Sequence, residues 1–570
     1  MHNMKKINQV NNPIIYLFLA LGVSSISYGI SSELRGLSIL LTVLFLLWIF
    51  LLWGMNFTLI LVIFFVVGLF INVSYYNIPD NVQGQVRIVK VSAYESIGSF
   101  HRKKLLIEDN EKIKLKLGEI YNVSGQIDKE NQNKNKGIVG SMKITSVSKC
   151  NGDLITKLYE IKDNIYGKLK KNLGIRKAGL LSSIAFGYSD GLDNEDKSDM
   201  KKFGVIHSIS VSGLHVAIVY GFFKIFLGNK LGLILCFIYV IFTGANYSSI
   251  RAFIMLGTVE GAEIVKRNNN SISSLCLSAM ILTIYKPYSI FETSFHLSYL
   301  ATLGIILVNK KVNNILYKFP EKLRECISVA LSAQVFTVPY LLLIFNELSL
   351  NFIIGNLCLI PFVNILVILG NLLIVFYSFS GVFNFICYLI LKSINLFDIV
   401  LNSIHNFSMP IIYGNEYLAM MYFAVMTSIY FIKKGFKKFV YMPAVVLILL
   451  VVKLYSPILS LKYYKEGAIL VSYRGERVLI SNKKQIDMER LAEISEASRT
   501  YRNINKINVC GKCRIRSYGK NYLLEFPDKK YLLKMSVGEK GTGDYDIINF
   551  KDGPFNKIFI LNNDIIKTCS

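Results

Sequence analysis

The chain has 570 residues, 52% of them hydrophobic, and its 64 Lys and Arg against 38 Asp and Glu give a formal net charge of +26. Uncharged apolar runs long enough to cross a bilayer recur along it, which excludes a soluble globular protein and indicates a polytopic α-helical membrane protein. The basic excess suits an anionic partner such as nucleic acid. Basic cytoplasmic loops are common in membrane proteins, however, so the charge alone leaves both explanations open.

The N-terminal region, residues 1–75, contains three apolar runs at about 13–30, 36–54 and 56–73. The first run follows a basic start and is succeeded at once by two others. This arrangement favours three transmembrane helices over a cleaved signal peptide.

Residues 76–152 are predicted to form a soluble domain. Short strand-like stretches separated by glycines, at Val86–Val89, Lys112–Leu117 and Tyr121–Ile127, indicate a small β-barrel of the OB-like kind. Such barrels often bind single-stranded nucleic acid in a basic groove. A polar linker, predicted to be helical, follows at 153–203.

Residues 204–455 form the main membrane region, in which nine or ten further hydrophobic segments are predicted. The run 351–376 contains Pro361 and is interrupted by Asn356, Asn364 and Asn371, which predicts a broken helix, buried in protein or lining a cavity. Residues 456–570 turn polar again and predict a small β-rich domain. Its expected strands are Ala468–Tyr473, Arg477–Ser481, Tyr522–Phe526, Tyr531–Met535 and Lys557–Leu561.

The distribution of basic loops predicts the topology. With the N-terminus inside and the broken run counted as one crossing, the basic turns of the membrane region fall on the cytoplasmic side. The barrel and the C-terminal domain then lie outside the cytoplasm.

Polar side chains collect in successive apolar segments of the membrane region. The segment HSISVSGLH, 207–215, would place Ser208, Ser212 and His215 on one face if it were helical, and Gly213 would allow close packing. Arg251 is costly in an apolar run, and Glu260 or Glu263 on the same stretch could neutralise it. Each residue alone fits helix packing, but their accumulation favours an aqueous path. The candidate path residues are His207, Ser208, Ser212, Gly213, His215, Arg251, His296, Ser298, Asn356 and Pro361.

Catalytic and metal-binding patterns are weak. The Ser and His residues of this segment have no evident orienting carboxylate, and His207 and His215 lack the HExxH spacing. Cys510 and Cys513 form a lone CxxC without a second pair of zinc ligands. We therefore expect no catalytic residues in the membrane region, no metal and no cofactor. The chain also has no GxxxxGK[ST] phosphate loop, so any energy for transport would come from a separate motor.

In chain order, these segments resemble the ComEC family of inner-membrane channels that import single-stranded DNA during natural transformation. The matching segments are IAFGYSDGLDNE (184–195), FGVIHSISVSGLHVAIV (203–219), SSIRAFIM (248–255), SFHLSYLATLGI (294–305), AQVFTVPYLL (333–342) and GNLCLIPF (355–362). The resemblance implies a polar channel lining that includes His207, Ser212, Gly213 and His215, with Arg251 and Ser298 on neighbouring helices and 356–361 at the break. It also implies single-stranded DNA, a DNA receptor and a helicase-like motor as partners, and leaves a monomer or a homodimer open.

The C-terminal region departs from many members of that family, which end in a metallo-β-lactamase-like domain with an HxHxDH motif. This chain has no histidine after His405, so EGAILVSYRGERVLIS would begin a degenerate version of the domain, and we predict no nuclease activity. Two other functions stay open: a transporter of a small anionic metabolite or lipid headgroup, and a non-conducting scaffold.

Overall fold

The structure is a computed structural model. It describes residues 12–31, 34–91, 96–108, 115–189, 191–266 and 268–483, and most of the remainder in shorter pieces: 486–502, 505–509, 513–519, 521–526, 529–535, 545–550, 557–561 and 564–568. The chain divides into two compact units. The first comprises Met1–Thr337 with Ser349–Pro410, and the second comprises Val338–Leu348 with Ile411–Ser570.

The first unit begins with the three predicted apolar helices, α1 (Pro13–Ile30), α2 (Arg35–Trp53) and α3 (Met55–Tyr76). Each is long and apolar enough to span a membrane. Buried polar groups between helices need hydrogen-bond partners, and here the buried Asn72 amide of α3 donates to Ser25 Oγ of α1 at 3.0 Å. The helices pack on one another and leave most of α2 exposed.

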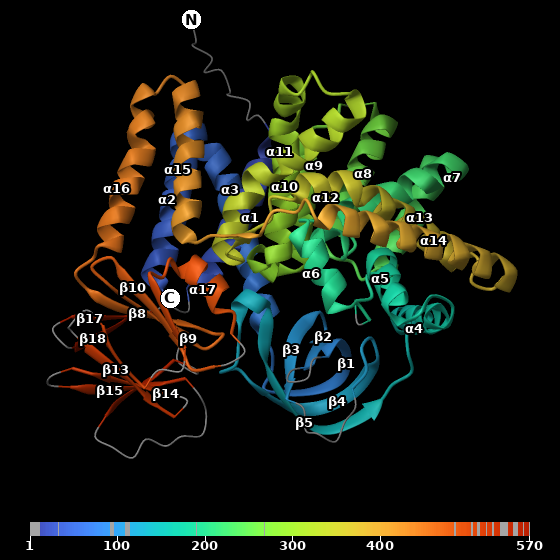
Figure 1. The fold of residues 1–570 in the computed structure, drawn as a ribbon. Helices are drawn as coiled ribbons and strands as arrows, with labels where there is room; N and C mark the ends of the chain where they lie inside the picture. Colours follow the sequence, from blue (N-terminus) through green and yellow to red (C-terminus); the bar gives the residue numbers. More distant parts are fainter. Residues whose placement is uncertain are drawn as a thin grey trace, which may run out of the picture. The chain divides into compact units, whose positions relative to one another are not determined.

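A closed five-stranded barrel follows, in the order β1-β2-β3-β5-β4 (Figure 1). Its core holds alternating side chains such as Val86, Ile88, Leu105 and Met142, as period-2 strands demand. The strands are β1 (Asn81–Val91), β2 (Ser96–Phe100), β3 (Lys103–Glu108), β4 (Ile120–Asp128) and β5 (Ile138–Lys149).

The predicted barrel is thus confirmed, and β1 and β4 contain two of the expected strands. The third expected strand, Lys112–Leu117, begins outside the described residues, and its described part is not a strand. Assignment to the OB type stays a prediction.

The predicted helical linker consists of α4 (Leu154–Leu173), α5 (Ile175–Phe186) and α6 (Asn194–Lys202). Arg176 at the start of α5 forms bidentate hydrogen bonds with Asp196 of α6, at 2.6 and 3.0 Å, and with Asp398, at 3.0 and 3.2 Å. Asp398 belongs to α14 (Ser380–His405), so one guanidinium joins three helices. Arg suits this role because its planar fork matches carboxylates.

The membrane region continues through η2 (Ile206–Ser208), α7 (Gly213–Phe242), α8 (Tyr247–Val265), α9 (Ser271–Tyr285), η3 (Pro287–Phe291), α10 (Thr293–Ile315), α11 (Glu321–Ile344), α12 (Phe352–Cys358), α13 (Ile360–Val375) and α14. All of these belong to the first unit except the end of α11 from Val338, which belongs to the second. Among the described residues, six helices meet the length and composition of a membrane span, namely α1, α2, α3, α7, α11 and α14. The bent pair α12–α13 would make seven.

The predicted break in the run 351–376 is confirmed. Helices α12 and α13 meet at an angle of 45°, with Leu359 fully buried at the corner and Pro361 in the first turn of α13. Leu359 and Val363 belong to the main apolar core. The irregular backbone is therefore shielded by protein, as it must be at membrane depth.

Helix α7 reverses direction, which the sequence analysis did not predict. Gly228 has φ 77° and ψ 175°, a backbone conformation that only glycine adopts easily. Cys236 Sγ lies 3.7 Å from the Val216 carbonyl oxygen, although twenty residues of straight helix would separate the two by about 30 Å. The 30 residues of α7 are therefore two antiparallel halves, and both ends of α7 lie together.

The second unit carries α15 (Glu416–Lys433), η4 (Lys437–Tyr441) and α16 (Met442–Leu454), followed by two sheets. The first sheet has the order β11-β10-β9-β8-β17-β18 and the second β12-β13-β14-β15-β16 (Figure 1). Side chains of both sheets share one core. The short β6 (Glu347–Leu348) pairs with β7 (Ile412–Tyr413), and α17 (Met488–Ser495) packs against β10.

The β-rich character predicted for the C-terminal region is confirmed, and all five expected strands are present. The strands are β8 (Leu459–Tyr464), β9 (Ala468–Tyr473), β10 (Glu476–Ser481), β11 (Arg499–Arg502), β12 (Lys506–Val509), β13 (Cys513–Tyr518), β14 (Asn521–Glu525), β15 (Lys530–Lys534), β16 (Asp546–Asn549), β17 (Lys557–Leu561) and β18 (Asp564–Thr568). A relation to metallo-β-lactamases stays a prediction.

Candidate functional site

The segment before α7 is a turn and not a helix. Residues 206–208 form a single 3-10 turn, Ser212 is extended, and α7 begins at Gly213. Gly204 has φ 66°, which ends the preceding helix. The shared helical face considered for Ser208, Ser212 and His215 is therefore absent: Ser208 belongs to the 3-10 turn, Ser212 is the N-cap of α7, and His215 is its third residue.

Ser212 and His215 form a capping box at the start of α7. The Ser212 side chain accepts a hydrogen bond from the backbone N–H of the third helical residue, and Ser212 N–H donates to His215 Nδ1 at 3.3 Å. The ring proton then resides on Nε2. His215 is fully buried, and its Nε2 has no hydrogen-bond partner among the described residues. The pair fixes where α7 begins.

Gly213 lies directly under the side chain of Arg251. A Cβ atom at Gly213 would be 2.7 Å from Arg251 Nη2 and 3.3 Å from Ala252 Cβ, so a larger residue would displace the arginine. Ser248 and Ser249 of α8 donate to the Val211 carbonyl oxygen at 3.1 and 3.2 Å. These two hydrogen bonds hold the first turn of α8 against the segment that leads into α7.

The Arg251 guanidinium is held by neutral groups. Its Nε donates to Ser298 Oγ of α10 at 2.8 Å, and its Nη1 donates to Thr302 Oγ1 one turn further along α10. Within the described residues no carboxylate forms an ion pair with it. The guanidinium therefore keeps its charge beside the N-terminus of α7, where the helix dipole is also positive.

Glu260 does not neutralise Arg251, contrary to the sequence-based suggestion. It is buried and accepts hydrogen bonds from Tyr220, from Lys224 at 2.9 Å and from Asn229 at 2.6 Å. Nine residues along a helix correspond to a rotation of about 180° from the starting face, which explains the separation. Lys224 and Asn229 flank the reversal of α7, so Glu260 binds both sides of that reversal, and Glu263 is exposed.

The structure gives the other predicted residues contacts of their own. His207 is exposed, and Ser208 Oγ donates to the Val205 carbonyl oxygen at 2.7 Å. The His296 ring contacts Phe295, its neighbour on α10. The amide of Asn356 bonds its own helix at Phe352 O, at 2.8 Å.

The structure thus brings together Ser212, Gly213, His215, Arg251 and Ser298. It adds Thr302, Ser248 and Ser249, which the sequence analysis missed. Thr302 could have been found, because it follows Ser298 by four residues and therefore shares its helical face.

Pro361 is exposed on α13. Its neighbour α12 packs on the loop before His207, since a Cβ at Gly355 would lie 2.2 Å from the Phe203 carbonyl oxygen. The broken helix therefore supports the turn that leads into α7.

Metal binding finds no support in the part of the chain that the structure describes, where no three His, Cys, Asp or Glu side chains form a group able to hold a metal ion. Cys510 of the CxxC pair lies outside the described residues, so the expectation for that pair is not tested.

Comparison with known proteins gives a consistent picture. Residues 184–435 match the family model of the Competence protein. The chain is 28% identical over 240 residues to ComE operon protein 3 of Bacillus subtilis (strain 168), covering 40% of this chain and 30% of the relative. It is 25% identical over 255 residues to Recombination protein 2 of Haemophilus influenzae, covering 40% and 31%. The matches thus span under a third of each relative. No solved structure matches significantly.

Proposed function

We propose, from the premise that this chain belongs to the ComEC family of competence proteins, that it conducts single-stranded DNA across the bacterial cytoplasmic membrane during natural transformation. The observation that carries the proposal is the Arg251 cluster. A DNA strand carries one negative charge per nucleotide and needs cationic or hydrogen-bonding groups along its route. Arg251 supplies a cation, and Ser298 and Thr302 supply hydroxyls beside it.

The surroundings of Arg251 fit transient contact with a polyanion. Hydroxyl groups orient a guanidinium without neutralising it, whereas a carboxylate would compete with each passing phosphate. Conduction also requires that each contact be weak enough to release the strand. One arginine beside one helix N-terminus meets that requirement better than a dense cationic cage.

The proposal extends to partners and orientation. The barrel and the C-terminal domain face outward, where a DNA receptor delivers the strand, and a cytoplasmic helicase-like motor supplies the energy because the sequence has no phosphate loop. The chain itself hydrolyses no DNA, since the histidines that a two-metal site of the metallo-β-lactamase type would need are not in its C-terminal region. Purified chain that cleaved DNA with Zn²⁺ or Mn²⁺ would contradict this part.

The test is import of labelled DNA by a competent host in which the gene is deleted and then restored as variants. Deletion is expected to abolish entry of label into the cytoplasm. Arg251→Ala is expected to reduce entry at least about tenfold, the equivalent of one charge-assisted contact, and Arg251→Lys less. The matched control is Lys230→Ala, which removes one positive charge from an exposed position on α7.

Two outcomes would overturn the proposal. Uptake that survives deletion of the gene removes the role in DNA entry. Uptake that is normal in Arg251→Ala, at normal protein abundance, reduces Arg251 to a packing residue. Transport of a small anion or lipid headgroup, which the same cation and broken helix could serve, would appear as phosphate flux without DNA flux in vesicles holding the purified protein.

A further inference from the structure

The second unit contains a cavity of about 450 Å³ that the proposed function does not use. It lies between the start of α15, the end of α16 and the first C-terminal sheet. Its size falls within the range of small-ligand sites. The residues that matter for its chemistry are Glu416, Tyr417, Lys453, Lys462, Arg477 and Lys557.

The cavity is strongly cationic. Four of its lining side chains are basic, and among the described lining residues Glu416 is the one carboxylate. Glu416 already faces Lys453, with Oε1 and Nζ 3.9 Å apart. The lining therefore has a surplus of positive charge even when this pair is counted as neutral.

Two of the lysines stand directly opposite each other in the sheet. Lys462 of β8 and Lys557 of β17 are cross-strand partners, an arrangement in which like charges repel. Burial lowers the pKa of Lys557, and the charges of Lys453, Lys462 and Arg477 lower it further, while Glu416 acts in the opposite direction. A bound anion would relieve this repulsion.

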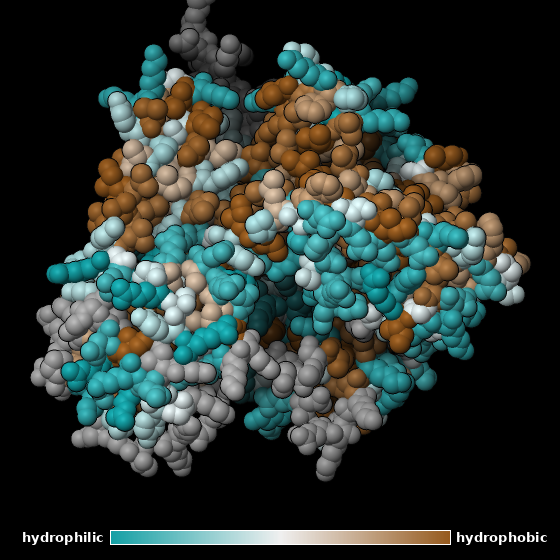
Figure 2. All heavy atoms as spheres, viewed as in Figure 1, coloured by the Kyte–Doolittle hydropathy of each residue, from teal (hydrophilic) through white to brown (hydrophobic). Residues whose placement is uncertain are grey.

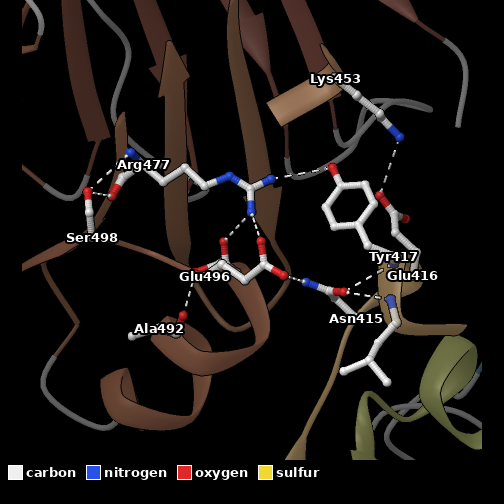
Figure 3. A network of polar contacts seen from close by, with 10 residues as sticks. Asn415, Glu416, Tyr417, Lys453, Arg477, Ala492, Glu496 and Ser498 are labelled. Atoms are coloured by element: carbon white, nitrogen blue, oxygen red, sulfur yellow. Dashed lines mark hydrogen bonds and ion pairs between the residues drawn. The ribbon is translucent and has the colours of Figure 1, made fainter. Parts of the chain in front are cut away.

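Arg477 is positioned by a polar network at the rim, shown in Figure 3. Its Nη1 donates to Glu496 Oε2 at 2.8 Å, and its Nη2 approaches the Tyr417 hydroxyl at 3.4 Å. Glu496 also accepts from Asn415 Nδ2 at 2.6 Å, and Asn415 caps α15. The buried Nε of Arg477 has no hydrogen-bond partner among the described residues.

The side chains beyond the cavity are apolar. Helix α16 ends at it and exposes a continuous apolar surface, with Ile448 and Leu449 each 62% exposed and Val452 64% exposed. Figure 2 shows hydrophobic side chains over α15 and α16. A cationic cavity at the end of an apolar helix matches a molecule with an anionic head and hydrocarbon tails.

We propose that this cavity binds the phosphate headgroup of an anionic phospholipid, with the acyl chains along α16. The phosphate oxygens accept hydrogen bonds from Lys462 and Lys557, and the Arg477 guanidinium lies beside them in the lining. Tyr417 borders the headgroup, as aromatic residues commonly do at membrane interfaces. The site is independent of the Arg251 cluster and of DNA passage.

The experiment titrates the full-length protein, in a neutral detergent, with short-chain phosphatidylglycerol and counts bound lipids by native mass spectrometry. The double variant Lys462→Gln with Lys557→Gln is expected to weaken binding about 30-fold, at roughly a factor of five per lysine. The matched control is Lys465→Gln with Lys530→Gln, two exposed lysines of the same unit, with an expected change below about twofold. Ser472→Trp, which fills the cavity without changing its charge, is expected to weaken binding as well.

A second readout shows that the variants fold. In lipid-free detergent the Lys462 and Lys557 double variant is expected to melt at a higher temperature than the parent protein, because the cross-strand repulsion is removed, and to lose the stabilisation by phosphatidylglycerol. Equal losses in both double variants would mean unspecific attraction and overturn the site. Glycerol 3-phosphate binding as tightly as phosphatidylglycerol would overturn the lipid as occupant, as would equal binding of phosphatidylcholine.

Discussion

Two arginines of the first unit occupy opposite kinds of surroundings. Arg176 is bound by two carboxylates, through three hydrogen bonds to Asp196 and two to Asp398, and joins three helices. Arg251 is bound by two hydroxyl groups and lies over the first turn of α7. A guanidinium whose charge is matched by carboxylates stabilises the fold, whereas one held by hydroxyls retains a charge that a ligand can use. On the proposed function, this difference assigns Arg176 to the fold and Arg251 to the DNA path.

The largest effect on stability is expected from Arg176→Ala. Asp196 is 3% exposed, and loss of its partner leaves a buried carboxylate unpaired, at a cost of about 3 kcal/mol. Thermal unfolding in detergent should shift markedly downward, while DNA import per folded molecule stays unchanged. Arg176→Lys should recover part of the loss. If Arg176→Ala, at equal protein abundance, lowered DNA import as much as Arg251→Ala, the two arginines would not differ in function as proposed.

Gly213→Ala should displace Arg251, because the added methyl group would lie 2.7 Å from Nη2. The guanidinium can move, so a stability cost of about 1 kcal/mol is expected, at the low end for overpacking. DNA import should fall nearly as far as in Arg251→Ala. The matched control is Gly221→Ala on the same helix, where a Cβ meets nothing within 4 Å. Normal import by Gly213→Ala would show that the position of the Arg251 guanidinium is unimportant.

Ser298→Ala removes the acceptor of Arg251 Nε and should cost about 1 kcal/mol of stability, as for one hydrogen bond. Import should fall a few-fold, because the guanidinium remains charged but is less well oriented. Thr302→Ala is expected to act similarly, and the double variant to approach Arg251→Ala. Additive losses in stability together with full import would assign both hydroxyls to packing alone.

The smallest effect concerns a third arginine, Arg87 of the barrel, which pairs with the exposed Asp153. This hydrogen bond lowers the pKa of Asp153 to about 2, against opposing desolvation. A depressed carboxyl pKa contributes stability above its unfolded value, and the contribution is lost as the pH falls from about 4 to 2. Arg87→Ala should remove that part of the pH dependence, measured as melting temperature against pH, at a cost below about 1 kcal/mol. An unchanged pH profile would contradict the pairing.

The elements that the sequence predicts well are those whose pattern is local. The three N-terminal helices follow from uninterrupted apolar runs, and strand β9 follows from a short apolar run that Gly467 precedes. The break between α12 and α13 follows from Pro361. Each of these signals acts within a few residues, so distant parts of the chain do not change it.

The site was predicted only in part because its geometry depends on long-range contacts. The sequence identified the segment 207–215 as a candidate site, and a helical conformation was considered for it. Its turn follows from Ser212 acting as the N-cap of α7, which the preference of serine for N-cap positions could have indicated. The partner of Glu260 could not be inferred from neighbours on α8. It depends on the reversal of α7, which brings Lys224 and Asn229 to that carboxylate.

The reversal of α7 at Gly228 also changes how many membrane crossings the chain is counted to make. A hydropathy count scores the 30 residues of α7 as a single traverse. Each of the two antiparallel halves is only about 22 Å long, which falls short of the hydrocarbon thickness, so we expect the chain to return to the side from which it entered. The parity that this hydropathy count assigns to loops after Phe242 therefore does not hold, and the orientation proposed above rests on the basic loops instead. Cysteine labelling at positions before and after α7 is expected to place both of its ends on the same side of the membrane.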